Sequence, residues 1–225
     1  MRTALVLLGK DLRLELRTLE TVPAMVLLAI VTFVIFHFGL NRDEIDGQLA
    51  AGVLTVSLLF AAMLGINRLV VAEREQGGFD AFLLAPVDRS AMLLAKAAAL
   101  FLFLSALEVV ALPAFAVLLL GPPLIPVLPG MVLILVLINV GLSVIGTLVS
   151  AIAVHTRARD LIGPIVGLPL LIPALIATAR AAGPLLAATR NGAAPPGRWL
   201  LVLALYDLVF ALLSYAVFDF LLEDQ

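Results

Sequence analysis

Residues 131–154 read MVLILVLINVGLSVIGTLVSAIAV and contain no charged side chain. An α-helix rises about 1.5 Å per residue, so a run of this length can cross the hydrocarbon core of a bilayer, which is about 30 Å thick. The stretch therefore predicts a transmembrane helix.

Five other apolar runs have a similar length. They cover residues 22–40, 49–72, 95–120, 161–182 and 199–222. Apolar residues make up 63% of the 225 residues and charged residues 13%, against about 45–50% and about 25% in soluble domains. Six helices of about 20 residues leave no room for a second, soluble domain. We therefore predict an all-α, polytopic membrane protein whose single transmembrane domain covers residues 1–225.

Residues 1–20 differ from a spanning helix and from a cleaved signal peptide. Leu5, Leu8, Leu12, Leu16 and Leu19 recur at helical spacing, with charged residues between them. This pattern predicts an amphipathic helix on the cytoplasmic membrane surface. An ordinary first turn before the first spanning helix is the alternative.

The distribution of positive charge predicts the orientation, because cytoplasmic loops of membrane proteins are enriched in Lys and Arg. With both termini in the cytoplasm, the inside segments hold ten of the 14 basic residues. These are Arg2, Lys10, Arg13, Arg17, Arg68, Arg74, Arg89, Lys96, Arg157 and Arg159. The outside then holds Arg42, Arg180, Arg190 and Arg198. Residues 73–94 would face the cytoplasm and residues 183–198 the periplasm, in the inner membrane of a bacterium.

Glu108, Asn139 and Asp207 are polar residues inside predicted spans. Acidic side chains are expensive in a bilayer and usually face the interior of a helix bundle. Glu108 in the third span can pair with Asn139, or with Arg68 or Asn67, on a neighbouring helix; Asp207 lies in the sixth span. A structural hydrogen bond and a substrate or proton-relay role both stay open for Glu108.

The fifth span is rich in helix-breaking residues. Pro164, Pro169 and Pro173 occur within ten residues, together with Gly163 and Gly167. Proline removes a backbone donor, so this helix should be kinked and its neighbours should satisfy the freed carbonyls. Such a kink can mark a substrate path or serve packing alone.

Catalytic and metal sites are not indicated. His37 and His155 lack a second histidine or carboxylate at ligand spacing, so we expect no metal site. Ser143 lacks a later histidine to act as its base, and no G-x-x-x-x-G-K-[ST] motif is present. If ATP is used, another subunit must hydrolyse it. The net charge of −2 and the absence of cysteine indicate neither nucleic acid nor thiolate ligands.

The polar excursion after the second span contains an unusual apolar piece. Its residues are Glu73, Glu75, Gly77, Gly78, Phe79, Asp80, Phe82, Leu83 and Pro86. A glycine break followed by aromatic and aliphatic side chains predicts a short helix that docks into a groove on a partner. A plain surface loop would not need three large apolar residues.

This excursion resembles the corresponding part of ABC-2-type exporter membrane subunits: acid-x-x-x-Gly-x-aromatic-acid-x-Phe-Leu-Leu-x-Pro, with Ala95-Lys96 about ten residues further on. The whole chain more closely resembles the CcmB family of cytochrome c maturation. Residues 12–17, LRLELR, and the proline-rich residues 167–179 are similar to that family's opening and fifth helix. Asn67, where an acid is expected, and Gly78, where Ser or Thr is common, depart from its pattern.

The resemblance implies an ABC-2-type permease that acts as a homodimer with two CcmA-like ATPase subunits and lies near CcmC, CcmD and CcmE. Residues 73–86 would couple ATP hydrolysis on the partner to haem export or to release of the haem-loaded chaperone. Haem would be cargo, and the chain would bind no cofactor. Export of a lipid, drug or polysaccharide, and a scaffold without a transport cycle, are the alternatives.

Overall fold

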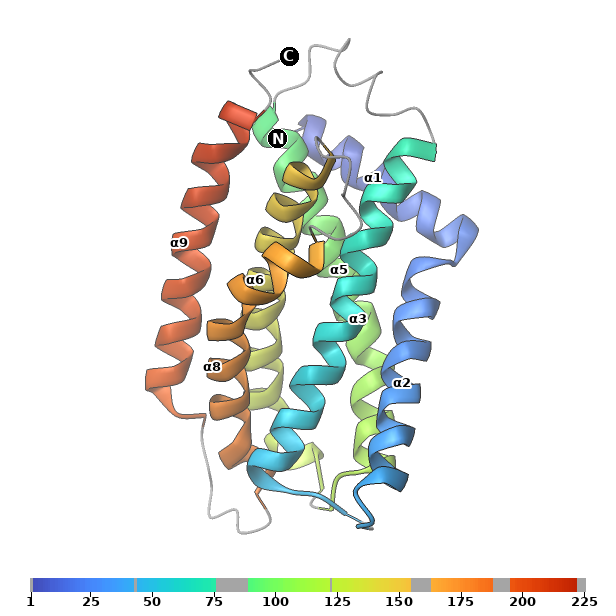
Figure 1. Cartoon of the computed structure of the whole chain (residues 1–225), viewed down its shortest axis with the longest axis vertical. Helices are drawn as coiled ribbons and strands as arrows, with labels where there is room; N and C mark the ends of the chain where they lie inside the picture. Colours follow the sequence, from blue (N-terminus) through green and yellow to red (C-terminus); the bar gives the residue numbers. More distant parts are fainter. Residues whose placement is uncertain are drawn as a thin grey trace.

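The protein is an all-α helical bundle. The computed structural model describes residues 2–42, 44–75, 89–121, 123–154, 163–187 and 195–221 (Figure 1). Its helices are α1 (Arg2–Thr18), α2 (Thr21–Gly39), α3 (Gly47–Glu75), α5 (Arg89–Leu118), η1 (Ile125–Val127), α6 (Leu128–Val154), η2 (Gly163–Gly167), α8 (Leu168–Leu186) and α9 (Gly197–Leu221). Within these ranges there is no β-strand, only an isolated bridge between Ile45 and Leu120.

All six predicted spans are confirmed as helices long and apolar enough to cross a membrane. Two of the predicted connections are too long. Helix α5 begins at Arg89 instead of residue 95, and α8 runs on to Leu186 instead of ending at residue 182. Hydropathy locates the centre of a span, whereas helical hydrogen bonding extends beyond it, so helix ends are placed only to within a few residues. The first six residues of α5, 89–94, read RSAMLL and precede the predicted span, and Lys96 follows just inside that span.

Helices α3 and α6 form the centre of the bundle, and α2 and α9 lie at its opposite edges (Figure 1). In the spanning windows of α3 and α6, 67% of the residues are buried, against 17% for α2 and α9. Helix α1 is inclined to the spanning helices at one end of the bundle, and α9 finishes at that same end (Figure 1). The chain has six spanning helices, an even number, so α1 and the end of α9 lie at the same end of the bundle.

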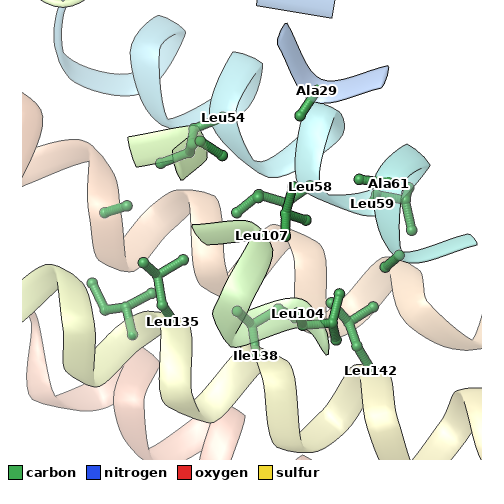
Figure 2. Close-up of a cluster of buried hydrophobic side chains, with 14 of the residues drawn as sticks. Ala29, Leu54, Leu58, Leu59, Ala61, Leu104, Leu107, Leu135, Ile138 and Leu142 are labelled. Carbon is green, nitrogen blue, oxygen red and sulfur yellow. The ribbon is translucent and has the colours of Figure 1, made fainter. Parts of the chain in front are cut away.

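Leucine and isoleucine side chains fill the space between the central helices. Figure 2 shows a part of this core, in which side chains of α3, α5 and α6 converge, with Ala29 of α2 beside them. Glycines let the helices approach closely. A Cβ atom at Gly65 would lie 2.9 Å from the sulfur of Met25, and one at Gly146 would lie 2.7 Å from Ile66 Cδ1.

The end of the bundle opposite α1 is held by backbone hydrogen bonds. The N–H of Ile45 donates to the carbonyl of Leu119 at 2.8 Å, and the N–H of Gly121 donates to the carbonyl of Ile45 at 3.3 Å. These bonds join the α2–α3 connection to the end of α5. The α2–α3 connection is thus hydrogen-bonded to the residues that follow α5 at that end of the bundle.

Candidate functional site

The predicted docking piece lies mostly outside the described residues. Gly77, Gly78, Phe79, Asp80, Phe82, Leu83 and Pro86 all fall in residues 76–88, between the end of α3 and the start of α5. Glu73 and Glu75 belong to the last turn of α3, and their side chains are not described. Docking of this piece stays a prediction, and the structure describes what holds the helices on either side of it.

A buried ion pair fixes α1 to the first turns of α5. Lys96 Nζ donates to Asp11 Oδ2 at 2.9 Å, and the side chains of Lys96 and Asp11 are only 11% and 8% exposed. Ala4, Ala91 and Ala95 form a small buried cluster between the same two helices, with Leu7 and Leu8 of α1 packed against it. Removing one partner of a buried pair leaves an uncompensated charge. The contact therefore specifies where α1 lies.

A second acid of α1 caps the next helix. Glu15 accepts hydrogen bonds from the backbone N–H groups of Val22 at 2.7 Å and Thr21 at 3.3 Å, through its two carboxylate oxygens. The first N–H groups of a helix have no partner within it, and the positive end of the helix dipole favours an anion there. Glu15 thus sets the angle between α1 and α2.

A third contact reaches α3 just before the predicted docking piece. Glu20, which precedes α2, lies 3.5 Å from Arg68 Nη1. Both side chains are largely exposed, at 64% and 44%, so this pair adds little stability by itself. It does place the α1–α2 corner beside the end of α3 that leads to residue 76.

Sequence reasoning missed these roles of Asp11 and Glu15, because it treated the charges of α1 as an exposed polar face. The overlooked signal is their spacing. Ala4, Leu8, Asp11 and Glu15 lie three or four residues apart, so they share one face of the helix. That face packs on the bundle, and the leucines expected to act together are divided: Leu8 and Leu12 pack against the core, whereas Leu5, Leu16 and Leu19 are exposed.

Glu108 pairs with one of its three expected partners. Asn139 Nδ2 of α6 donates to Glu108 Oε2 of α5 at 2.9 Å, with both residues buried. Asn67 and Arg68 are exposed near the end of α3, and Arg68 contacts Glu20 instead. The hydrogen bond joins two spanning helices and therefore has a structural role. It does not identify a substrate.

Asp207 is buried between α9 and α6. Both carboxylate oxygens lack a hydrogen-bond partner among the described residues. Oδ1 lies against Gly141 of α6, where an added Cβ would be 2.6 Å away. The hydroxyl oxygens of Ser143 and Ser214 are likewise buried without a partner in the described part of the chain. Gly141 is thus the residue that makes room for an acid at this helix contact.

The proline-rich span begins irregularly. Pro164 lies in η2, a π-helical turn, Pro169 lies at the start of α8, and Pro173 and Pro184 lie inside α8. The first turns of this segment run at an angle to the rest of α8 (Figure 1). Proline at 173 leaves the carbonyl of residue 169 without its helical donor. Beside it, the hydroxyl of Tyr206 donates to the carbonyl of Leu170, so α9 supports the bend.

One of the two histidines lies in the part of the chain that the structure describes. His37 is in the last turn of α2, with its ring edge-on to that of Phe38, and His155 lies outside the described residues. Among the residues that the structure describes, no three His, Asp or Glu side chains gather as metal ligands would.

Six spanning helices with an inclined N-terminal helix pinned to their end define a multi-pass membrane protein. Sequence comparison identifies its family. The family model described as CcmB protein matches residues 2–221, and the chain belongs to that family, as the resemblance predicted.

Curated relatives agree with this assignment. Heme exporter protein B of Rhodobacter capsulatus is 32% identical over 171 residues, covering 76% of this chain and 78% of the relative. The proteins of the same name from Paracoccus denitrificans and Pseudomonas aeruginosa are 28% and 30% identical over 213 residues, or 94% of this chain and 94% and 92% of theirs. No solved structure matches the fold.

Proposed function

We propose that this chain is the membrane subunit of an ABC transporter complex for cytochrome c maturation. It would couple ATP hydrolysis by a separate CcmA-like ATPase to haem export or to release of a haem-loaded chaperone. The observation that carries the proposal is the family match over residues 2–221, together with relatives named as heme exporters along nearly the whole chain. Haem is the cargo in this account, and ATP is bound by the partner.

The contacts around α1 support a mechanical role. Residues 73–86 would dock on the ATPase, and the helices on both sides of this piece are held to the α1–α2 corner. Asp11 holds α5 through Lys96, and Glu20 lies against Arg68 of α3. Both helices then enter the packed core (Figure 2). A displacement of the docked residues 73–86 would therefore move α3 and α5 as rigid bodies.

The proposed orientation places α1 and the end of α9 in the cytoplasm of a bacterium, with the protein in the inner membrane. The bias of Lys and Arg supports it, with ten of 14 on the inside segments. The ATPase requires the same orientation, because residues 73–86 must face the compartment that holds ATP. The bend of α8 and the Asp207 contact then lie between the docking end and the periplasmic end.

Partners follow from the family. We expect a homodimer with two ATPase subunits, and CcmC-, CcmD- and CcmE-like proteins nearby. Trp199 is the only tryptophan, and a haem-handling surface rich in tryptophan is therefore not encoded in this chain. That favours mechanical coupling over direct ligation of haem by this subunit.

Deletion of the gene in its host tests the proposal. Covalent haem attachment to c-type cytochromes, detected by haem staining after denaturing electrophoresis, should disappear, whereas b-type cytochromes should keep their spectra. The wild-type gene should restore staining. Normal c-type cytochromes in the deletion strain would refute the proposal, and a defect in a lipid, drug or polysaccharide would then support an exporter with another cargo.

A further inference from the structure

Helix α1 presents a surface of one charge sign to its surroundings. Both of its acids are used inside the protein, Asp11 by Lys96 and Glu15 by the start of α2, and they are only 7% and 8% exposed. Arg13 and Arg17 are exposed. The acids of α1 are thus withdrawn from its surface, and its outer face is basic.

Large apolar side chains lie beside these arginines. Leu5, Leu16 and Leu19 are 69%, 74% and 60% exposed. At about 100° per residue Leu5 and Leu16 lie about 20° apart on α1, and Arg13 and Arg17 begin about 60° further round the helix, whereas Leu19 follows the last residue of α1 with a positive φ of 49°. An apolar stripe flanked by arginines suits the boundary between acyl chains and phosphate groups, where leucines enter the hydrocarbon and guanidinium groups reach the headgroups.

We propose that the outer face of α1, formed by Leu5, Arg13, Leu16 and Arg17, together with the exposed Leu19 just after the helix, binds anionic phospholipid. The charge pattern selects this occupant: zwitterionic lipid would accommodate the leucines, but it has no net negative charge to attract the two exposed arginines. The headgroup selectivity stands independently of haem transport, and only its assignment to the cytoplasmic leaflet rests on the proposed orientation. Since α1 is fastened to α5 through Lys96, the lipid also fixes the height of the docking end relative to the bilayer.

The absence of cysteine from the sequence gives a direct test. The full chain with Leu16→Cys, carrying a fluorophore, is reconstituted in phosphatidylcholine vesicles. A fixed fraction of the lipid is either brominated phosphatidylglycerol or brominated phosphatidylcholine. Bromine quenches on contact, so the ratio of the two quenching constants measures the enrichment of anionic lipid at α1.

The ratio should exceed one and fall towards one when Arg13 and Arg17 are both changed to Gln. Each basic residue near an anionic surface contributes about 1 kcal/mol, which is about a fivefold change in binding for one arginine and at most about thirtyfold for two at low salt. Raising the salt should reduce the ratio in the wild type as well. The matched control changes two exposed arginines towards the other end of the bundle, Arg42 and Arg180, to Gln and should leave the ratio unchanged.

Three results would overturn the proposal. Equal quenching by both lipids in the wild type would show a membrane contact without headgroup selectivity. No quenching by either lipid would show that α1 does not touch the bilayer. A double arginine variant that keeps the lipid ratio but no longer retains the ATPase would assign these arginines to a protein interface. None of these results depends on haem staining, so the proposed function and this inference can fail separately.

Discussion

Removal of one member of the ion pair between Asp11 and Lys96 should loosen the attachment of α1 to the bundle. Its 2.9 Å geometry and side-chain exposures of 8% and 11% make it a buried pair. Removal of one member of such a pair costs about 3–5 kcal/mol, whereas replacement of both by apolar residues of similar volume is often nearly neutral. We therefore predict that Asp11→Leu and Lys96→Met each loosen α1, and that the double variant is no worse than either single variant. Lys96→Met should cost less, because Lys10 Nζ still lies 3.4 Å from Asp11.

Hydrogen exchange of the α1 amides in the detergent-solubilised full chain measures this attachment. If α1 opens locally, a loss of about 3 kcal/mol raises its exchange rates about 150-fold, while amides in the centre of α6 should change far less. Arg13→Gln, at an exposed position of the same helix, is the matched control and should alter the rates little. Single variants with unchanged exchange, or a double variant whose loss equals the sum of the two single losses, would refute the role of the pair.

Three other contacts lead to predictions that thermal unfolding of the purified chain can check. Glu15→Ala should destabilise by about 1 kcal/mol through loss of the α2 cap, with Glu15→Gln retaining part of it; equal loss in both variants would argue against capping. Gly141→Ala should lower the melting temperature because its Cβ would press on Asp207 Oδ1 at 2.6 Å, and Asp207→Ala should suppress that loss; an unsuppressed loss would place the clash elsewhere. Asn139→Leu should cost about 1–3 kcal/mol by leaving Glu108 buried without its donor, and combining it with Glu108→Leu should recover much of this; additive losses would contradict their pairing.

The spanning helices could be predicted because their signal is one of composition and length. Residues 131–154 leave no alternative to a membrane span, since lipid accepts only backbone that is hydrogen-bonded internally. The ends of α5 and α8 could not be predicted in the same way. Helical bonding starts at Arg89, six residues before the predicted span, because residues 89–94, RSAMLL, contain no helix-breaking residue.

Polar contacts were predicted less well, for a physical reason. Glu108 was expected to find a partner on another helix, and Asn139 was among the candidates because an unpaired acid in lipid is costly. Which candidate it meets depends on helix rotation and depth, which apolar periodicity in a uniformly hydrophobic span hardly constrains. Asp11 and Glu15 were missed because an amphipathic helix at a bilayer and one packed on a protein have the same alternation. Only the tertiary contact with α5 and α2 distinguishes which face turns inward.

The proposed ATPase coupling through residues 73–86 is tested most directly by co-purification. The full chain is co-expressed with the CcmA-like ATPase subunit of the same organism, and the complex is isolated in mild detergent through a tag on this chain. Wild type is compared with Asp80→Arg and Phe82→Asp, and Arg180→Gln serves as the control. Our account predicts that wild type and the control retain the ATPase, whereas both variants lose it and still purify as folded chains with unchanged melting temperatures. A wild-type chain that retains no ATPase, or variants that retain it fully, would contradict the account.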